Sequence, residues 1–203
     1  LTDIADWGMA AFYCKNVGAR AKVLVDLGHH PLSTNIEHIV AFLIDERLLG
    51  GFHFNNRKYG DDDLTTGSIN PYETFLIYNE IVAAESDPST GRPDIAYMVD
   101  QSHNIKPKME AMIQTVMAIQ SAFAKSLLVD RATLLESQSN EDTVRSELIL
   151  QEAYGTDVRP LLARVRQEAG LHPDPLAAYK ESGYFERISV DRVGELEGGS
   201  SWG

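Results

Sequence analysis

The sequence predicts an α/β fold in which a few parallel strands alternate with helices, followed by a carboxy-terminal stretch of helices alone. Over residues 1–128, short aliphatic runs alternate with segments whose apolar residues recur every three or four positions. From residue 129 onward only the helical spacing continues. Strands that alternate with helices form parallel sheets. We therefore expect two parts, a βα-repeat part over residues 1–128 and a helical extension over residues 129–203.

The first elements are a helix, a strand and a second helix. Apolar residues with helical spacing predict a helix over residues 5–18. A continuous aliphatic run at residues 23–25 predicts a strand that is covered on both faces. Thr34 and Glu37 have the spacing of a capping box, which predicts that the second helix begins there.

Two further strand–helix pairs follow. A strand is predicted at residues 50–54, and Asn70 with Pro71 marks the start of the next helix. The third strand is expected at residues 95–99, and its helix begins near Pro107. Later helices are expected at residues 141–154 and 157–169, and a short one from Asp174. About three strands are therefore expected, all before residue 128.

Composition limits the classes of partner and compartment. The 203 residues carry a net charge of -12, which argues against nucleic acid because phosphate binding needs clustered Lys and Arg. The single cysteine, Cys14, rules out an internal disulfide and fits a reducing compartment. No apolar run approaches the ~20 residues of a membrane helix, so a cytoplasmic location without membrane partners is expected. Because the chain starts at Leu1, we also expect it to be the carboxy-terminal portion of a longer protein.

Acidic and histidine residues follow each predicted strand. The sets are Asp26 with His29, then His53 with Asp61 and Asp63, then Asp100 with His103. One such residue at a strand end is usually structural, but three consecutive strand ends that carry them are hard to attribute to chance. The carboxyl ends of parallel strands meet at one edge, where α/β proteins place their chemistry.

The acidic triplet at residues 61–63 is the sharpest local motif. In an irregular loop, Asp61 and Asp63 can point the same way while Asp62 faces solvent. With His53 nearby, their oxygens would suit a divalent ion such as Mn, Mg, Co or Zn. The alternative is a solvated acidic turn, which is what most acidic triplets are.

Three segments resemble the L-rhamnose isomerase family, of the bacterial type that also interconverts rare sugars such as allose and psicose. They read VDLGHHPLSTNIEHIVAFL, GGFHFNNRKYGDDDL and YMVDQSHNIKPKMEAMIQ. The resemblance covers most of residues 1–128 and continues into the helical tail. Xylose isomerase and its relatives are more distantly similar.

The resemblance implies a (β/α)8 TIM barrel with two divalent cations, with manganese the first expectation and magnesium, cobalt or zinc as alternatives. It implies that Asp26, His53 and Asp100 bind a structural metal, and that His29, Asp61 and Asp63 bind a catalytic one. A glutamate and a lysine that the family also uses would precede Leu1, so this chain alone lacks part of the active site. The family further suggests a homotetramer.

The implied activity is aldose–ketose isomerisation of the L-rhamnose to L-rhamnulose type, with D-allose and D-psicose as further substrates. The hydrogen would move as a hydride or through an ene-diol, and Asp100 is the candidate base for the proton route. Ser102 and His103 are expected to contact the sugar, although His103 could instead orient a ligand or cap its loop.

Two other classes of function stay open. One is another divalent-metal enzyme on the same barrel, either xylose isomerase-like or endonuclease-like, and the acidic balance argues against an endonuclease. The other is an inactive barrel fragment in which the metals only hold the fold.

Overall fold

The computed structural model describes residues 3–60, 62–102 and 105–198, with side chains as far as Arg192. The chain divides into two compact units, Leu1–Arg159 and Pro160–Gly203. Each unit is described by itself.

The first unit alternates helices and strands and then continues as helices. Its elements are α1 (Trp7–Val17), β1 (Val23–Asp26), α2 (Ile36–Asp45), β2 (Leu49–Phe54), α3 (Pro71–Ser86), the short 3-10 helix η1 (Pro88–Thr90), β3 (Ala96–Val99), α4 (Lys108–Leu127), α5 (Arg131–Ser139) and α6 (Thr143–Gly155). The three strands are parallel and lie in the order β1-β2-β3. The predicted α/β class and the parallel pairing are thereby confirmed.

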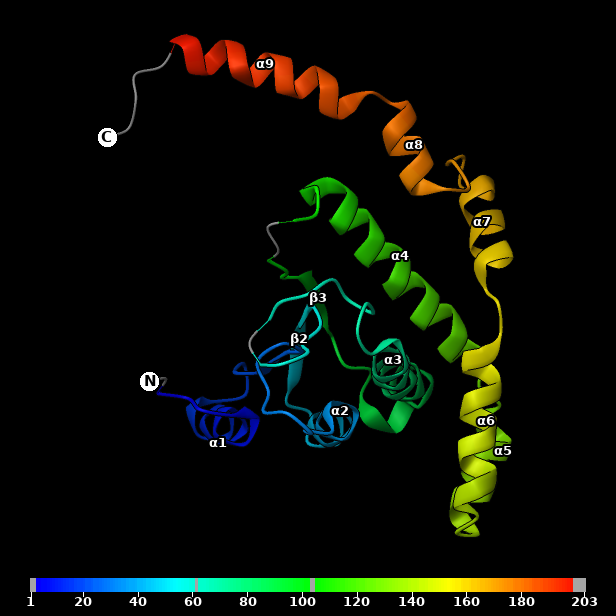
Figure 1. Ribbon diagram of the computed structural model, residues 1–203. Coiled ribbons are helices and arrows are strands. Elements are labelled where there is room, and N and C mark those ends of the chain that lie inside the picture. The colour runs from blue at the N-terminus through cyan, green and yellow to red at the C-terminus, as the bar shows by residue number, and fades with distance from the viewer. Residues whose placement is uncertain (1–2, 61, 103–104, 199–203) are drawn as a thin grey trace. The chain divides into compact units, whose positions relative to one another are not determined.

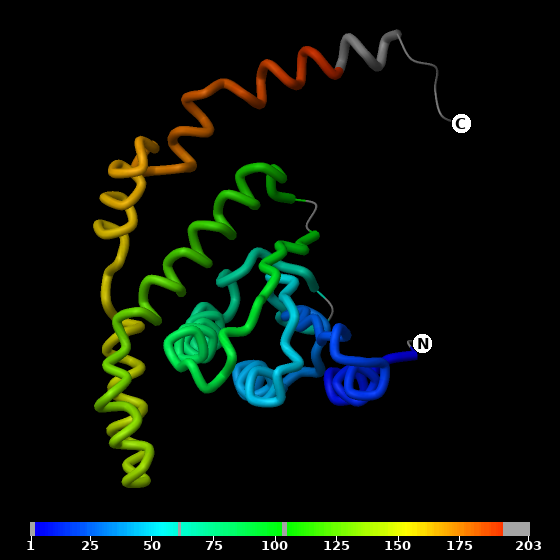
Figure 2. Tube along the Cα trace, turned by 180° about the vertical axis from the view of Figure 1, so that it is seen from behind, coloured from blue at the N-terminus to red at the C-terminus, as the bar shows by residue number. Residues whose placement is uncertain are grey.

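One face of the sheet is buried beneath helices. Val25, Phe52 and Phe54 lie in one apolar cluster with side chains of α2 and α3. Figures 1 and 2 show α1, α2 and α3 as neighbours along this side of the sheet. Burial of aromatic and branched side chains here supplies the main driving force for folding of the unit.

The opposite face of the sheet is open to solvent. Leu24 is 44% exposed and Met98 is 38% exposed. The expectation that residues 23–25 are covered on both faces is therefore wrong for Leu24, because the described helices cover only the other side.

Sequential strand order with crossover helices on one face is the arrangement of successive units in a (β/α)8 barrel. Doubly wound sheets instead carry helices on both faces. Three strands do not close a barrel. The barrel itself therefore stays a prediction.

Paired glycines let the backbones at the start of β2 approach their neighbours. A Cβ on Gly50 would lie 2.4 Å from the Cβ of Lys22, and one on Gly51 would lie 3.0 Å from the carbonyl oxygen of Ala96. Any larger residue would force these strands to move.

The helix caps agree with the sequence at α3 and differ at α2. Asn70 accepts a hydrogen bond from the Glu73 amide, and Pro71 occupies the first helical position. At α2 the cap is Asn35, which accepts from the His38 amide, so the predicted cap at Thr34 is wrong by one position. Both residue types cap helices well, and the backbone conformation decides between them.

Helices α5 and α6 contribute to a second apolar core in the first unit. Phe75 of α3 packs there with Leu134 of α5 and Ile149 of α6. The compact unit therefore extends to Arg159, beyond the change of sequence pattern at residue 128. The division into residues 1–128 and 129–203 stays a prediction, although every regular element described after residue 128 is a helix.

In the second unit, the helices have no buried core among the side chains that the structure describes. Its elements are α7 (Arg159–Glu168, which begins at the unit boundary), α8 (Pro175–Glu181) and α9 (Tyr184–Gly198). None of its described side chains is fully buried. Packing within the unit thus adds little hydrophobic stabilisation.

No single helix in the described ranges is long and apolar enough to cross a membrane. The bent pair α4–α5 meets the length and composition test only when its two helices are taken together.

Candidate metal centre at the carboxyl end of the sheet

The register of the sheet brings acidic and imidazole side chains to its open face. Asp26 of β1 is paired with His53 of β2, and His53 with Met98 of β3. Side chains alternate along a strand, so Asp100 continues on the side of Met98. Asp26, His53 and Asp100 therefore project from three adjacent strand ends toward one place.

Asp26, His53 and Asp100 form a first triad. The His53 Nδ1 atom lies 3.0 Å from Asp26 Oδ2 and 3.1 Å from Asp100 Oδ2. A ring nitrogen carries at most one hydrogen, so it cannot donate a separate bond to each carboxylate. Adjacent ligands of an octahedral cation lie about 3 Å apart, so this spacing suits a shared divalent ion.

Asp26, His29 and Asp63 form a second triad beside the first. The His29 Nε2 atom lies 3.6 Å from Asp26 Oδ2 and 3.5 Å from Asp63 Oδ1. In each triad the potential ligand atoms all lie within 4.8 Å of one another. Asp26 belongs to both triads, so the two positions share a carboxylate.

The structure thus brings together five of the six residues that the resemblance implies as metal ligands. The sixth, Asp61, lies outside the described residues, as does His103. Ser102 lies near the second triad, since its backbone amide donates to the carbonyl oxygen of Asp63 at 3.0 Å. Metal binding by these residues stays a prediction.

Asn55 lies beneath both triads, and sequence reasoning missed it. Its side chain is fully buried and its Nδ2 contacts Asp26 Oδ1 at 2.9 Å, Asp63 Oδ1 at 3.1 Å and the Asp100 carbonyl oxygen at 2.9 Å. A signal was present, because residues two apart in an extended strand share a face and Asn55 follows His53 by two.

The acidic loop is held at its base and inside its turn. Asn56 and Leu64 exchange two backbone hydrogen bonds of 2.7 Å, which close the loop as an antiparallel bridge. Asp62 Oδ2 accepts from three backbone amides, those of Lys58, Tyr59 and Gly60. These bonds lower the pKa of Asp62. The middle aspartate of the triplet thus shapes the loop while it remains accessible to solvent, as expected.

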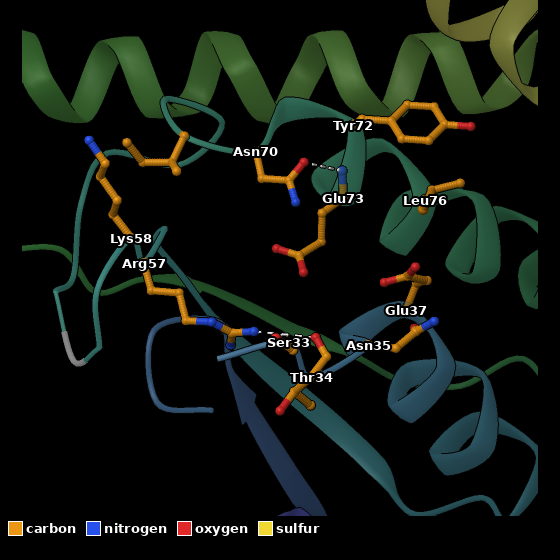
Figure 3. Close-up of a pocket in the computed structure, with 11 residues that line it drawn as sticks. Ser33, Thr34, Asn35, Glu37, Arg57, Lys58, Asn70, Tyr72, Glu73 and Leu76 are labelled. Atoms are coloured by element: carbon orange, nitrogen blue, oxygen red, sulfur yellow. Dashed lines mark hydrogen bonds between the residues drawn. The ribbon is translucent and has the colours of Figure 1, made fainter. Parts of the chain in front are cut away.

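A separate pocket of about 510 Å³ lies between the starts of α2 and α3. Figure 3 shows Glu37, Glu73 and Arg57 around it, and no triad residue lines it. The Arg57 guanidinium donates to the carbonyl oxygens of Leu27 and Thr34 and so ties two strand-end loops together. Burial raises the pKa of Glu73, the charge of Arg57 opposes this shift, and Glu37 adds to it.

Comparison of the sequence with known proteins finds two relatives. The chain is similar to probable sugar isomerases. A probable sugar isomerase of Mesorhizobium japonicum is 45% identical over 199 residues, covering 98% of this chain and 46% of that protein. One of Rhizobium meliloti is 45% identical over 198 residues, with the same coverage. The chain thus spans about half the length of these curated relatives, and no protein-family profile matches it.

Proposed function

We propose that the protein is a divalent-metal-dependent sugar isomerase that interconverts an aldose and a ketose. The observation that carries this proposal is the pair of triads that share Asp26 at the strand ends. The similarity to probable sugar isomerases over 98% of the chain supports the class of reaction.

The donor set of the triads fits a hard or borderline divalent cation. Carboxylate oxygens and imidazole nitrogens suit Mn, Mg, Co and Zn, and no thiolate is among the ligands. Asp26, His53 and Asp100 would hold one ion, and His29, Asp63 and Asp61 the other. Manganese is our first choice. When bound, such a cation would supply Lewis-acid polarisation of two neighbouring sugar oxygens.

The roles of the protein's own groups follow from exposure. The Asp100 side chain is 56% exposed, whereas that of Asp26 is 14% exposed. Asp26 is thus suited to hold the site, and Asp100 to meet the substrate. With Oδ2 toward His53, Asp100 would use Oδ1 as the base in a proton-transfer route. Direct hydride transfer would require no such base, so retention of the migrating hydrogen in deuterated water distinguishes the two routes.

The finer assignments extend the resemblance to L-rhamnose isomerase. They are conversion of L-rhamnose to L-rhamnulose, activity on D-allose and D-psicose, a complete (β/α)8 barrel and a homotetramer. The open sheet face supports the barrel, because further strands would cover it.

Isomerisation of L-rhamnose by the intact protein tests the proposal. Chelation by EDTA should abolish turnover and added Mn²⁺ should restore it, because the cation carries the polarisation. His53→Ala should be inactive, while His38→Ala, on the exposed side of α2, should be fully active. Turnover that survives both EDTA and His53→Ala would contradict the proposal. Loss of thermal stability on chelation, with no turnover on any aldose, would favour a purely structural metal site.

A further inference from the structure

Asn55 joins the two triads from beneath. It donates to Asp26 Oδ1, which also accepts from the Gly28 amide at 3.0 Å. That oxygen is therefore occupied within the protein, and Asp26 Oδ2 is left facing the two histidines. The second contact of Asn55, to Asp63 Oδ1, fixes the loop that carries the second triad. The carbonyl oxygen of Asp100, 2.9 Å from Nδ2, shares the two amide hydrogens with these carboxylates and thereby ties the end of β3 to them.

The orientation of the Asn55 amide follows from these contacts. Three oxygens surround Nδ2, so a flipped amide would set Oδ1 against acceptors. In this orientation Oδ1 is buried without a hydrogen-bond partner. A buried unsatisfied acceptor destabilises the fold. Such local costs are typical of functional sites, where the side chain serves the chemistry as well as the packing.

The side chain has almost no room to move. A Cβ on Gly28 would lie 3.0 Å from Asn55 Oδ1 and 3.0 Å from Asp63 Oδ1. Gly28 thus lets the amide and the loop carboxylate pack directly against the end of β1. Adding a methyl group there would push on both.

We propose that Asn55 is the positioning residue that sets Asp26 and Asp63 for two neighbouring cations at once, so that its loss weakens binding at both positions. The inference rests on the proposed function. Asn55 itself binds neither cation nor substrate and acts through the carboxylates that it orients.

Mn²⁺ titration of the intact protein tests this, with calorimetry for affinity and the electron paramagnetic resonance line shape of bound Mn²⁺ for ligand geometry. Asn55→Ala should weaken both binding steps by roughly 10- to 100-fold, as loss of an outer-shell partner does, and should alter the line shape. The matched control is Asn56→Ala. Asn56 is also buried, but its Oδ1 accepts from the amides of Ile69 and Asn70, away from the triads. This control should lower stability and leave Mn²⁺ affinity and line shape unchanged.

Gly28→Ala provides an independent variant should Asn55→Ala fail to fold. Its methyl group should displace both the Asn55 amide and the Asp63 carboxylate without removing either, and Mn²⁺ binding should weaken at both positions. Wild-type Mn²⁺ affinity and line shape in the folded Asn55→Ala and Gly28→Ala variants would overturn the inference and leave the proposed function standing. Weaker binding at only one of the two cation positions would also overturn the inference. If the wild-type protein binds no Mn²⁺, the proposed function fails and takes the inference with it.

Discussion

At the residue scale, Asp26 shows how one carboxylate can be given two tasks. Its Oδ1 is saturated by the Gly28 amide and Asn55, and its Oδ2 faces His53 and His29. The two oxygens are thus separated into an anchored atom and an available one. In an aspartate without these hydrogen bonds the carboxylate group would rotate freely, so neither oxygen would be held toward the histidines.

Glu80 on α3 should make stability depend on pH. Burial raises its pKa above the ordinary 4.5, while a hydrogen bond from Asn79 and the charge of Arg131 oppose the shift. Below pH 4.5 the carboxyl is protonated in both the folded and unfolded states and imposes no cost. As the pH rises through the raised folded-state pKa, the unfolded state ionises more readily, so stability is lost.

The Glu80→Gln variant should therefore have a higher melting temperature than wild type at pH 7. The difference should vanish near pH 4, because the amide keeps the hydrogen-bond acceptor and lacks the charge. Thermal unfolding at both pH values measures this. Glu152→Gln, exposed on α6, is the control and should change neither value. A Glu80→Gln protein that is less stable at pH 7 would show that attraction to Arg131 outweighs desolvation.

Sequence reasoning identified the residues whose chemical type favours a cation and missed Asn55, which contacts two of them directly through their carboxylates. Asp26, His53 and Asp100 stand out because carboxylates and imidazoles follow consecutive strands. Asn55 carries no charge, and asparagines after a strand usually signal a turn. Its role depends on contacts with residues 29 and 8 positions away, which only the folded chain shows.

At the element scale, the glycine pair of β2 sets how closely the three strands pack. Gly50→Ala should lower the free energy of unfolding by about 1–3 kcal/mol, as overpacking typically does, because its Cβ would lie 2.4 Å from that of Lys22. Chemical denaturation measures the change. Gly155→Ala on α6, whose Cβ would meet nothing within 4 Å, should cause no loss. Equal stability of the two variants would mean that the Lys22 side chain yields without cost.

The order and type of the βα elements were predictable from the sequence. The capping residue of α2 and the solvent exposure of one sheet face were not. Periodicity places α2 well, yet Thr34 and Asn35 are both good caps, and only the backbone angles select Asn35. The aliphatic run at residues 23–25 indicates a strand, but it does not say whether a second layer covers Leu24. Whether another layer covers this face of the strand depends on the neighbouring elements, and residues 23–25 alone do not determine it.

At the scale of the whole molecule, the sheet formed by the described residues has an open face and two outer strands, β1 and β3. Expressed by itself, the 203-residue chain should therefore self-associate despite its charge of -12. Size-exclusion chromatography with light scattering measures the mass. Leu24→Ser should reduce the association, and Leu148→Ser, on an exposed position of α6, should not. A monodisperse wild-type monomer would contradict this.

The extent of the first compact unit was the part least accessible from the sequence. Near residue 128 the strands end, which suggests a boundary, but α5 and α6 return to pack on Phe75 of α3. Helical spacing predicts that Leu134 and Ile149 lie on apolar faces that pack against another element. It does not identify that partner, because packing partners are chosen by shape across a long separation in sequence.

The two-bond bridge between Asn56 and Leu64 has a consequence for how this protein can diversify. These hydrogen bonds hold the two ends of the loop together, so the positions at which the chain enters and leaves the loop stay fixed. Substitution of the exposed Tyr59 side chain should thus leave Asp63 in place, because it keeps the backbone amides that hold Asp62. Substitutions at this position can therefore change the surface of the loop while the carboxylate next to the bridge stays fixed.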